Sequence, residues 1–433
     1  MERRLRKRWW KLVAGHMHTA GRLATGVTAL PDVSGAFACT QAMWRFLAND
    51  RVTLPALIVP PREAGRLGVA DSHCGYALLV HDWSKLSYPG HRSKTDQTQI
   101  TRSKDIGYEL YTALLVDADR GCPLAPMELE LRSATGVYST QQEQPAEPRP
   151  HLSQVLPVMQ AAARWGLRPR LVHVIDREAD SVAHFRTWHE TGQLFLVRAD
   201  DNRLVRWGGP LRKLVHIARE LQCCGAFRHT RRVTYHGRPV EQFVAEAEVL
   251  LDRPAWIRTL AGKRRRLRGE PLTLRLVVAQ VRDAEGQVLA QWLLLTNVPA
   301  SGSADQIAMW YYWRWQIESF YKLLKSAGLE LEHWQQETAE AIAKRLLVAS
   351  MACVTIWRLQ QQQTPAALEF QRVLVRLSGR QMKRTRPITT PALLHGLEKL
   401  LPVLALLHDY APHQLRRLLR EAMPILPFLR DTS

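Results

Sequence analysis

The sequence predicts an α/β protein with helical segments before and after its strands. Apolar runs with strand character recur between residues 76 and 175, and a helical pattern at 152–165 lies between the last two of them. Further strand-like runs follow between 194 and 296, and from residue 339 onward the pattern is mostly helical. Strands that alternate with helices are typical of an α/β core, and we expect the later strands to form a β-rich insertion.

The individual elements are predicted from short patterns of apolar residues. Near the N-terminus we expect short helices over 22–57, of which 41–49 is the clearest amphipathic piece. Apolar runs predict strands at 76–80, 110–116, 127–131, 171–175, 194–198, 243–251, 272–281 and 288–296. Helical patterns are present at 152–165, 178–189 and 311–325, and a break at 360–365 divides the C-terminal helices.

Size and charge narrow the classes of function. The chain has 433 residues, of which 46% are hydrophobic, and this is enough for two or three domains with a substantial core. Its formal net charge of +20 exceeds what solubility requires and points to a polyanion, with nucleic acid as the first candidate. The basic residues gather in four places: Arg3, Arg4, Arg6, Lys7 and Arg8; Arg228, Arg231 and Arg232; Lys263 to Arg268; and Lys383 to Arg386.

Composition alone does not decide what the positive charge is for. A run of charge is most often a solvated face, and an anionic membrane surface would also attract it. We expect no membrane insertion, because the apolar run 346–356 is about half of the ~20 residues that a spanning helix needs. Six cysteines without CxxC spacing indicate reduced thiols, and the basic start lacks the apolar run of a secretory signal. A cytoplasmic protein is therefore expected.

Four chemically useful side chains share one stripe of the predicted helix 311–325. Tyr311, Arg314, Glu318 and Lys325 fall within an arc of about 60°, and the opposite flank is apolar enough to anchor the helix. A carboxylate held beside an arginine, a lysine and a phenol suits a metal ion and the phosphates around it. Taken alone, the pattern also fits a surface helix with an i, i+4 ion pair worth a few tenths of a kcal/mol.

Two aspartates end strand-like runs. Asp82 ends the run that starts at Tyr76, and Asp176 ends the run that starts at Leu171. In an open α/β sheet, ligands gather beyond the carboxyl ends of the strands. Two such aspartates on neighbouring strands, together with Glu318, would offer hard oxygen ligands to a pair of Mg²⁺ ions, which is equipment for phosphoryl transfer. For either aspartate alone, a turn residue or a helix cap accounts for the position as well.

The spacing on the predicted helix resembles a family signature. Tyr311-x2-Arg314-x3-Glu318-x6-Lys325 is similar to the Tyr-Arg-Glu-Lys signature of DDE-type bacterial insertion-sequence transposases, the insertion-sequence family four group. All the spacings of the signature match. The two aspartates precede it in the order that the family shows.

Further segments resemble the same family. Residues 176–180 are similar to its block around the second catalytic aspartate, and residues 81–88 to its block around the first. Residues 196–198 and 292–296 resemble segments of a cut-and-paste member. The resemblance covers roughly residues 35 to 358, and the combination of motifs is much more specific than any one of them.

The resemblance implies an RNase H-like catalytic core that a β-strand insertion interrupts, flanked by helical N- and C-terminal domains. The implied domains are a helical N-terminal DNA-binding domain at 1–62, an RNase H-like catalytic domain at 63–335 with its insertion at about 200–298, and a helical C-terminal domain at 336–433. By fold analogy, the last of these could pair two protomers.

The resemblance also implies roles for single residues. It makes Asp82, Asp176 and Glu318 catalytic and metal-binding, with two Mg²⁺ ions as cofactor and Mn²⁺ as a substitute. It assigns DNA contacts to Arg198, Trp292, Tyr311, Arg314 and Lys325. Arg198 would bind a phosphate, and Trp292 matches a tryptophan on which a flipped base stacks. A tryptophan in the core of a strand is the alternative for Trp292.

The expected function is that of a transposase. It would carry out Mg²⁺-dependent cut-and-paste DNA transposition, in which it binds terminal inverted repeats, cleaves strands and joins the 3′-OH ends to target DNA. The expected partners are double-stranded DNA of the element ends and the target, and a second copy of the chain in the DNA-bound complex. A catalytically inactive DNA-binding derivative and a metal-dependent DNA nuclease are the alternatives. The chain departs from the compared relative at Trp83, where that relative has threonine.

Overall fold

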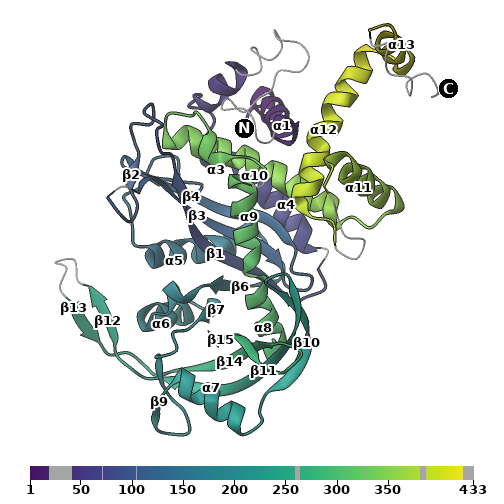
Figure 1. The fold of residues 1–433 in the computed structure, drawn as a ribbon. Helices are drawn as coiled ribbons and strands as arrows, with labels where there is room; N and C mark the ends of the chain where they lie inside the picture. Colours follow the sequence, from purple (N-terminus) through teal and green to yellow (C-terminus); the bar gives the residue numbers. More distant parts are fainter. Residues whose placement is uncertain are drawn as a thin grey trace. The chain divides into compact units, whose positions relative to one another are not determined.

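The computed structural model describes residues 1–18, 41–70, 72–103, 105–258, 264–326, 328–380 and 387–422 (Figure 1). The chain gathers into two compact units, one made of Met1–Leu57, Leu86–Gly107 and Lys322–Ser433 and the other of Ile58–Lys85 and Tyr108–Tyr321. Two of the predicted features, the helices over 22–40 and the basic cluster at Lys383 to Arg386, lie outside the described residues, as does Lys263 of another cluster.

The second unit is built on one large mixed sheet. Its strand order is β5-β4-β3-β1-β6-β7-β15-β14-β11-β8-β9. The first six of these strands are β5 (Gly136–Ser139), β4 (Pro123–Ser133), β3 (Ile106–Asp117), β1 (Tyr76–Ser87), β6 (Arg170–Ile175) and β7 (Leu194–Arg198). β1, β6 and β7 run parallel, whereas β3, β4 and β5 are joined by antiparallel pairing. The short strand β2 (Thr98–Gln99), which pairs with the start of β3, belongs to the first unit.

The parallel strands read as unbroken apolar runs because both faces of the sheet are covered. The first six residues of β1 are all buried, and so are the last four of β6. α5 (His151–Ala162) and α6 (Val182–Glu190) pack in one apolar cluster with β6 and β7, and α4 (Val59–Ala70) packs against β4. On α6, the ring of Phe185 stacks on Phe195 of β7 with 5.1 Å between centroids. This contact packs α6 against β7, the strand next to β6 in the sheet.

The predicted β-rich insertion extends the same sheet. β15 (Val288–Thr296) pairs antiparallel with β7, and β14 (Leu272–Arg282) and β11 (Arg238–Leu251) follow it. The remaining elements of the insertion are β8 (Leu204–Arg206), β9 (Leu211–Lys213), α7 (Leu214–Cys223), β10 (Arg228–Tyr235) and the separate pair β12 (Ala255–Arg258) and β13 (Arg264–Leu267). The strands predicted from apolar runs are therefore confirmed, most of them with longer bounds, in a mixed α/β fold.

The predicted helix 311–325 is two helices. α8 (Ala304–Trp313) ends at Arg314, and α9 (Trp315–Lys325) starts directly after it. At the junction, the backbone N–H groups of Arg314 and Ile317 donate to carbonyls three residues earlier, as in a tighter 3₁₀ turn. The prediction of a single helix was wrong here, because an apolar pattern does not report a change in hydrogen-bond register at one residue.

A buried ion pair joins α4 to the sheet. Arg62 Nη2 lies 2.9 Å from Glu128 Oε2 on β4, and its Nε donates to the Met127 carbonyl at 2.8 Å. The Glu128 side chain is fully buried, and burial raises its pKa in spite of the guanidinium. Removal of Arg62 would leave a buried carboxylate without its countercharge.

Arg62→Met is therefore expected to lower the free energy of unfolding by about 3 kcal/mol, measured by denaturant titration. The matched control is Arg66→Met on the same helix, because Arg66 pairs with Glu63 where both side chains are about half exposed. That variant should unfold like the unmodified chain. Equal effects of the two substitutions would contradict the assignment of a buried pair.

The first unit is mostly helical. Its helices are α1 (Arg3–His18), residues 41–47, α3 (Leu54–Leu57), part of α9, α10 (Ala339–Gln361), α11 (Pro365–Ser378), α12 (Thr390–Asp409) and α13 (Pro412–Ala422). α10 is buried along most of its length and packs against α1, α3, α11 and α12. The predicted break at 360–365 is confirmed by the end of α10 and by Thr364, whose side chain caps α11. Among the described residues, α12 has the length and apolar composition of a spanning helix, although core helices of soluble proteins share them.

Residues 86–107 belong with these helices although they lie far from them in the sequence. Tyr88 donates its hydroxyl to the Leu331 carbonyl at 2.9 Å, and the buried Lys94 donates to the carbonyls of Trp334 and Gln336. The boundaries predicted near residues 62 and 335 do not coincide with those of the compact units. The division into three domains stays a prediction.

Candidate active site

One guanidinium lies among the three predicted acids. The Arg314 side chain is only 7% exposed, and its Nη1 lies 3.7 Å from Asp82 Oδ2. Its Nη2 lies 3.5 Å from Asp176 Oδ2 and 2.5 Å from Glu318 Oε1. Three carboxylates that are widely separated in the sequence thus meet at one side chain within the second unit. The Nε atom of Arg314 is buried and has no hydrogen-bond partner among the described residues.

Asp82 lies within β1 and not at its end. β1 pairs with β6 only as far as Val80, and it continues to Ser87 beside β3. The predicted strand end at Asp82 was wrong, since the apolar run stops where β1 parts from β6 and becomes more exposed. The Asp82 carboxylate accepts a hydrogen bond from the Trp83 N–H at 2.9 Å. The main-chain carbonyl of Asp82 accepts one from the Tyr321 hydroxyl at 2.7 Å.

Asp176 follows β6 directly and also serves as a cap. Its side chain accepts the Arg177 N–H at 2.7 Å and thereby caps the short 3₁₀ helix Arg177–Ala179. It also accepts the Tyr311 hydroxyl at 3.0 Å, and Arg198 Nη1 from the end of β7 lies 3.7 Å away. Asp176 therefore caps a helix and also belongs to the candidate site, two roles that were treated as alternatives from the sequence.

The two aspartates differ in proton affinity. Burial raises the pKa of Asp82 to about 6, and the nearby Arg314 only partly offsets this. Burial acts on Asp176 in the same direction, but Arg314, the Arg177 N–H, the Tyr311 hydroxyl and Arg198 together bring its pKa below the usual value. The surrounding acids and Tyr311 raise the pKa of Arg314 although burial opposes this, so its guanidinium stays charged.

The two remaining predicted DNA-contacting residues, Trp292 and Lys325, lie in different surroundings. Trp292 on β15 is half-buried, and its ring lies 6.5 Å from that of Tyr311 and 6.0 Å from that of Tyr235. It packs in a small apolar cluster with residues of β10, β11 and β14, as expected of the core alternative, and its contact with a flipped base stays a prediction. Lys325 belongs to the first unit, where it lies 3.4 Å from Glu332, and it is not placed relative to the acids.

Sequence reasoning missed the residues that surround Trp83. Its indole N–H donates to Gln154 Oε1 at 2.7 Å, and its ring stacks on His151 with 4.6 Å between centroids. His151 lies between Glu109 and Glu178, and hydrogen bonds to these carboxylates raise its pKa to about 9. Trp83, at the position where the compared relative has threonine, therefore stacks on a protonated imidazole ring. In the sequence, this arrangement was marked only by the tryptophan that stands where the compared relative has threonine.

A buried chain of polar rings lies behind Asp82. His81 Nδ1 lies 2.7 Å from the Tyr111 hydroxyl, and its Nε2 lies 2.9 Å from His173 Nδ1. Burial lowers the pKa of His173 to about 3, so this ring is neutral. Strand alternation places His81 on the face opposite Asp82, and the chain of rings therefore fixes the strand from behind. No motif in the sequence pointed to it.

The donor set suits hard divalent cations, since all three groups are carboxylates. Because one Nη2 atom contacts both Asp176 Oδ2 and Glu318 Oε1, these oxygens are no more than about 6 Å apart. Among the described residues, however, no three His, Cys, Asp or Glu side chains form a group that could hold an ion. In this arrangement the guanidinium of Arg314 separates the acids that would act as ligands.

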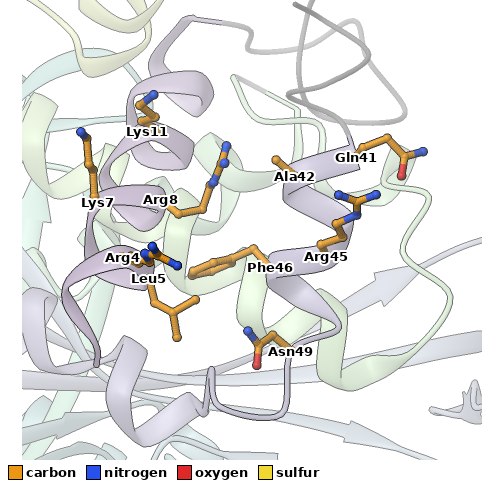
Figure 2. A pocket seen from close by; sticks show the side chains of 10 residues that line it. All are labelled: Arg4, Leu5, Lys7, Arg8, Lys11, Gln41, Ala42, Arg45, Phe46 and Asn49. Carbon is orange, nitrogen blue, oxygen red and sulfur yellow. The ribbon is translucent and has the colours of Figure 1, made fainter.

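A second basic feature lies in the first unit (Figure 2). A groove of about 720 Å³ runs between α1 and the helix 41–47. α1 lines it with Arg4, Lys7, Arg8 and Lys11, spaced so that they share one side of the helix, and Arg45 lines it from the helix 41–47. The opposite side of α1 is apolar and buried, with Trp9, Leu12 and Val13. The groove is therefore a strongly cationic surface on a firmly packed helix.

No protein-family model matches the chain, and no curated protein matches it. Among solved structures, the chain is similar to one described as the cryo-EM structure of piggyBac transposase synaptic complex with hairpin DNA, with a TM-score of 0.33 and 10% sequence identity. The similarity covers 80% of this chain and 57% of that chain, so it extends over little more than half the length of the piggyBac transposase chain. A likeness at this level assigns no family to the chain.

Proposed function

We propose that the chain is a DNA transposase of the DDE type, which cuts an element from DNA and joins it to a target. One observation carries the proposal: Asp82, Asp176 and Glu318 meet around Arg314, although three separate motifs contribute them. We further propose that β4, β3, β1, β6 and β7 form an RNase H-like core, with the strands from β8 to β15 as its insertion.

The proposed cofactor is two Mg²⁺ ions, for which Mn²⁺ could substitute. When bound, such ions activate the attacking oxygen and stabilise the leaving oxygen of the phosphodiester. Asp82, Asp176 and Glu318 would hold them through carboxylate oxygens. These three residues are the only ones to which the proposal gives a metal-binding role.

The basic side chains beside the acids are proposed to bind the DNA strand near the cut. Arg198 and Arg314 already stand next to carboxylates, so each could exchange its present contact for a phosphate oxygen. Tyr311 donates to Asp176, and burial raises the pKa of its phenol, so it remains a hydrogen-bond donor at neutral pH. Trp292 and Lys325 are proposed as further contacts. A position at the nucleoid within the cytoplasm would follow from this role.

The groove of α1 supports the DNA partner independently of the acids. Five cationic side chains from two helices face one hollow, as expected of a surface that follows a phosphate backbone. Binding there would be electrostatic and should weaken steeply with added salt. We also propose that the DNA complex contains a second copy of the chain, because by fold analogy the helical C-terminal domain could pair two protomers.

The test uses DNA that carries the inverted repeats flanking the coding region. The chain is incubated with this DNA and Mg²⁺, and the products are separated by size. We expect nicks at the repeat ends, followed by products joined to target DNA. Nicks without joined products would favour the nuclease, and binding without nicks would favour the inactive derivative. Either result would overturn the transposase proposal.

A further inference from the structure

A small β-ribbon stands apart from the large sheet. β12 and β13 form their own two-stranded antiparallel sheet within the second unit. In its register, Ala255 lies opposite Leu267, and Trp256 lies opposite Arg266. Because directly opposite residues share a face, Trp256 and Arg266 project on the same side of the ribbon.

The base of the ribbon is held firmly on both of its strands. Ala255 is buried in the core of the second unit. Arg186 on α6 donates through Nε to the Glu270 carbonyl at 2.9 Å and through Nη2 to the Arg253 carbonyl at 3.1 Å. A Cβ at Gly269 would lie 2.9 Å from Arg186 Nη1, so a residue without a side chain allows this close approach. The ribbon is thus a positioned element.

The ribbon carries aromatic and cationic side chains, and by strand alternation Arg265 projects on the face opposite that of Trp256 and Arg266. Trp256 is 67% exposed, and Arg265, Arg266 and Arg268 are exposed as well. Residues 253–269 contain no Asp or Glu. Three arginines within four residues gather positive charge on the ribbon, and a polyanion would relieve the repulsion among them. Tryptophan and arginine are both enriched at binding interfaces relative to the rest of a protein surface, so an exposed tryptophan beside arginines is typical of a recognition surface.

We propose that this ribbon is a contact for double-stranded DNA that is separate from the acids and from the groove of α1. Arg265, Arg266 and Arg268 bind backbone phosphates, and Trp256 packs against the edge of the groove. The dimensions favour DNA, because the major groove of B-form DNA, about 12 Å wide, admits a two-stranded β-ribbon, whereas that of A-form RNA is too narrow for side chains to read. The inference deepens the proposed function and rests on it for the choice of DNA as partner.

The test compares two doubly substituted chains that lose the same charge. Arg265→Ser with Arg266→Ser removes two ribbon arginines, and Arg168→Ser with Arg219→Ser removes two exposed arginines elsewhere in the second unit. Affinity for a short duplex is measured at several salt concentrations. The ribbon variant should bind more weakly at low salt, and the slope of log affinity against log salt should become shallower by about 2. The control pair should leave both quantities near those of the unmodified chain.

Trp256→Ala supplies a second and independent measurement. It should weaken duplex binding without changing the salt slope, because it removes an apolar contact and no charge. Since all these side chains are exposed, the variants should melt like the unmodified chain, and a melting test verifies this. Unchanged affinity and slope in the ribbon variant would overturn the proposal. A loss of binding to duplex RNA or to anionic vesicles, with duplex DNA binding retained, would also overturn it.

The outcomes separate this inference from the proposed function. If the unmodified chain binds DNA but does not cut it, the proposed function fails, and the ribbon is still judged by its salt slope. If the chain cuts and joins DNA while the ribbon variant binds like the control pair, the ribbon proposal fails alone.

Discussion

Glu318→Gln is expected to abolish DNA strand cleavage and to leave DNA binding close to that of the unmodified chain. Glutamine keeps the size of the side chain but removes the charge that would hold a divalent cation. It also keeps an acceptor oxygen for Arg314 Nη2, which now lies 2.5 Å from Glu318 Oε1. We expect the cleavage rate in Mg²⁺ to fall about a thousandfold, the upper end of the loss seen when a site loses one group that stabilises developing charge.

The matched control is Glu248→Gln, the same change at an exposed position of β11. It should cut at the rate of the unmodified chain. Binding is measured in parallel on the same inverted-repeat DNA, so that a failure to bind is not mistaken for a failure to cut. Cleavage by the Glu318 variant at the rate of the control would remove Glu318 from the catalytic set.

The sequence predicted the elements of the site better than it predicted their assembly. Asp176 was expected at the end of a buried strand, and it lies there because an apolar run and the polar residue after it report burial directly. The i, i+4 contact of Arg314 with Glu318 also follows from local spacing. That the same guanidinium reaches Asp82 does not follow, since this depends on how α8 and α9 pack against a strand that lies far earlier in the sequence.

Features without a local signature were not predictable. The tighter turn at Arg314 changes hydrogen bonds in the backbone, which side-chain periodicity does not report. The rings around Trp83 of β1 come from β3 and α5, and only the tertiary fold brings them together. Likewise, residues 86–107 belong to the first compact unit, in which Lys94 donates to the distant carbonyls of Trp334 and Gln336. Apolar patterns therefore determined the strands, while long-range polar contacts determined the site.

Arg314→Gln is expected to strengthen binding of Mn²⁺ to the DNA-free chain by about tenfold. In the unmodified chain the buried guanidinium contacts all three carboxylates and so competes with any cation for the same oxygens. Its removal leaves three carboxylates that repel one another, and a divalent cation relieves that repulsion. The measurement is titration of free Mn²⁺ by electron paramagnetic resonance, with no DNA present. Arg203→Gln, which breaks the ion pair with Asp180 in the same unit, is the control and should leave Mn²⁺ affinity unchanged.

Addition of duplex DNA should act on the two chains differently. A phosphate offers Arg314 another anionic partner, so DNA should free the carboxylates of the unmodified chain and raise its affinity for Mn²⁺. By linkage, Mn²⁺ should then raise its affinity for DNA by the same factor. The Arg314 variant has no guanidinium to move and should show much weaker coupling between the two ligands. Equal coupling in both chains, or weaker Mn²⁺ binding by the DNA-free variant, would show that Arg314 does not compete with the cation, and the acids would then have to bind metal by another rearrangement.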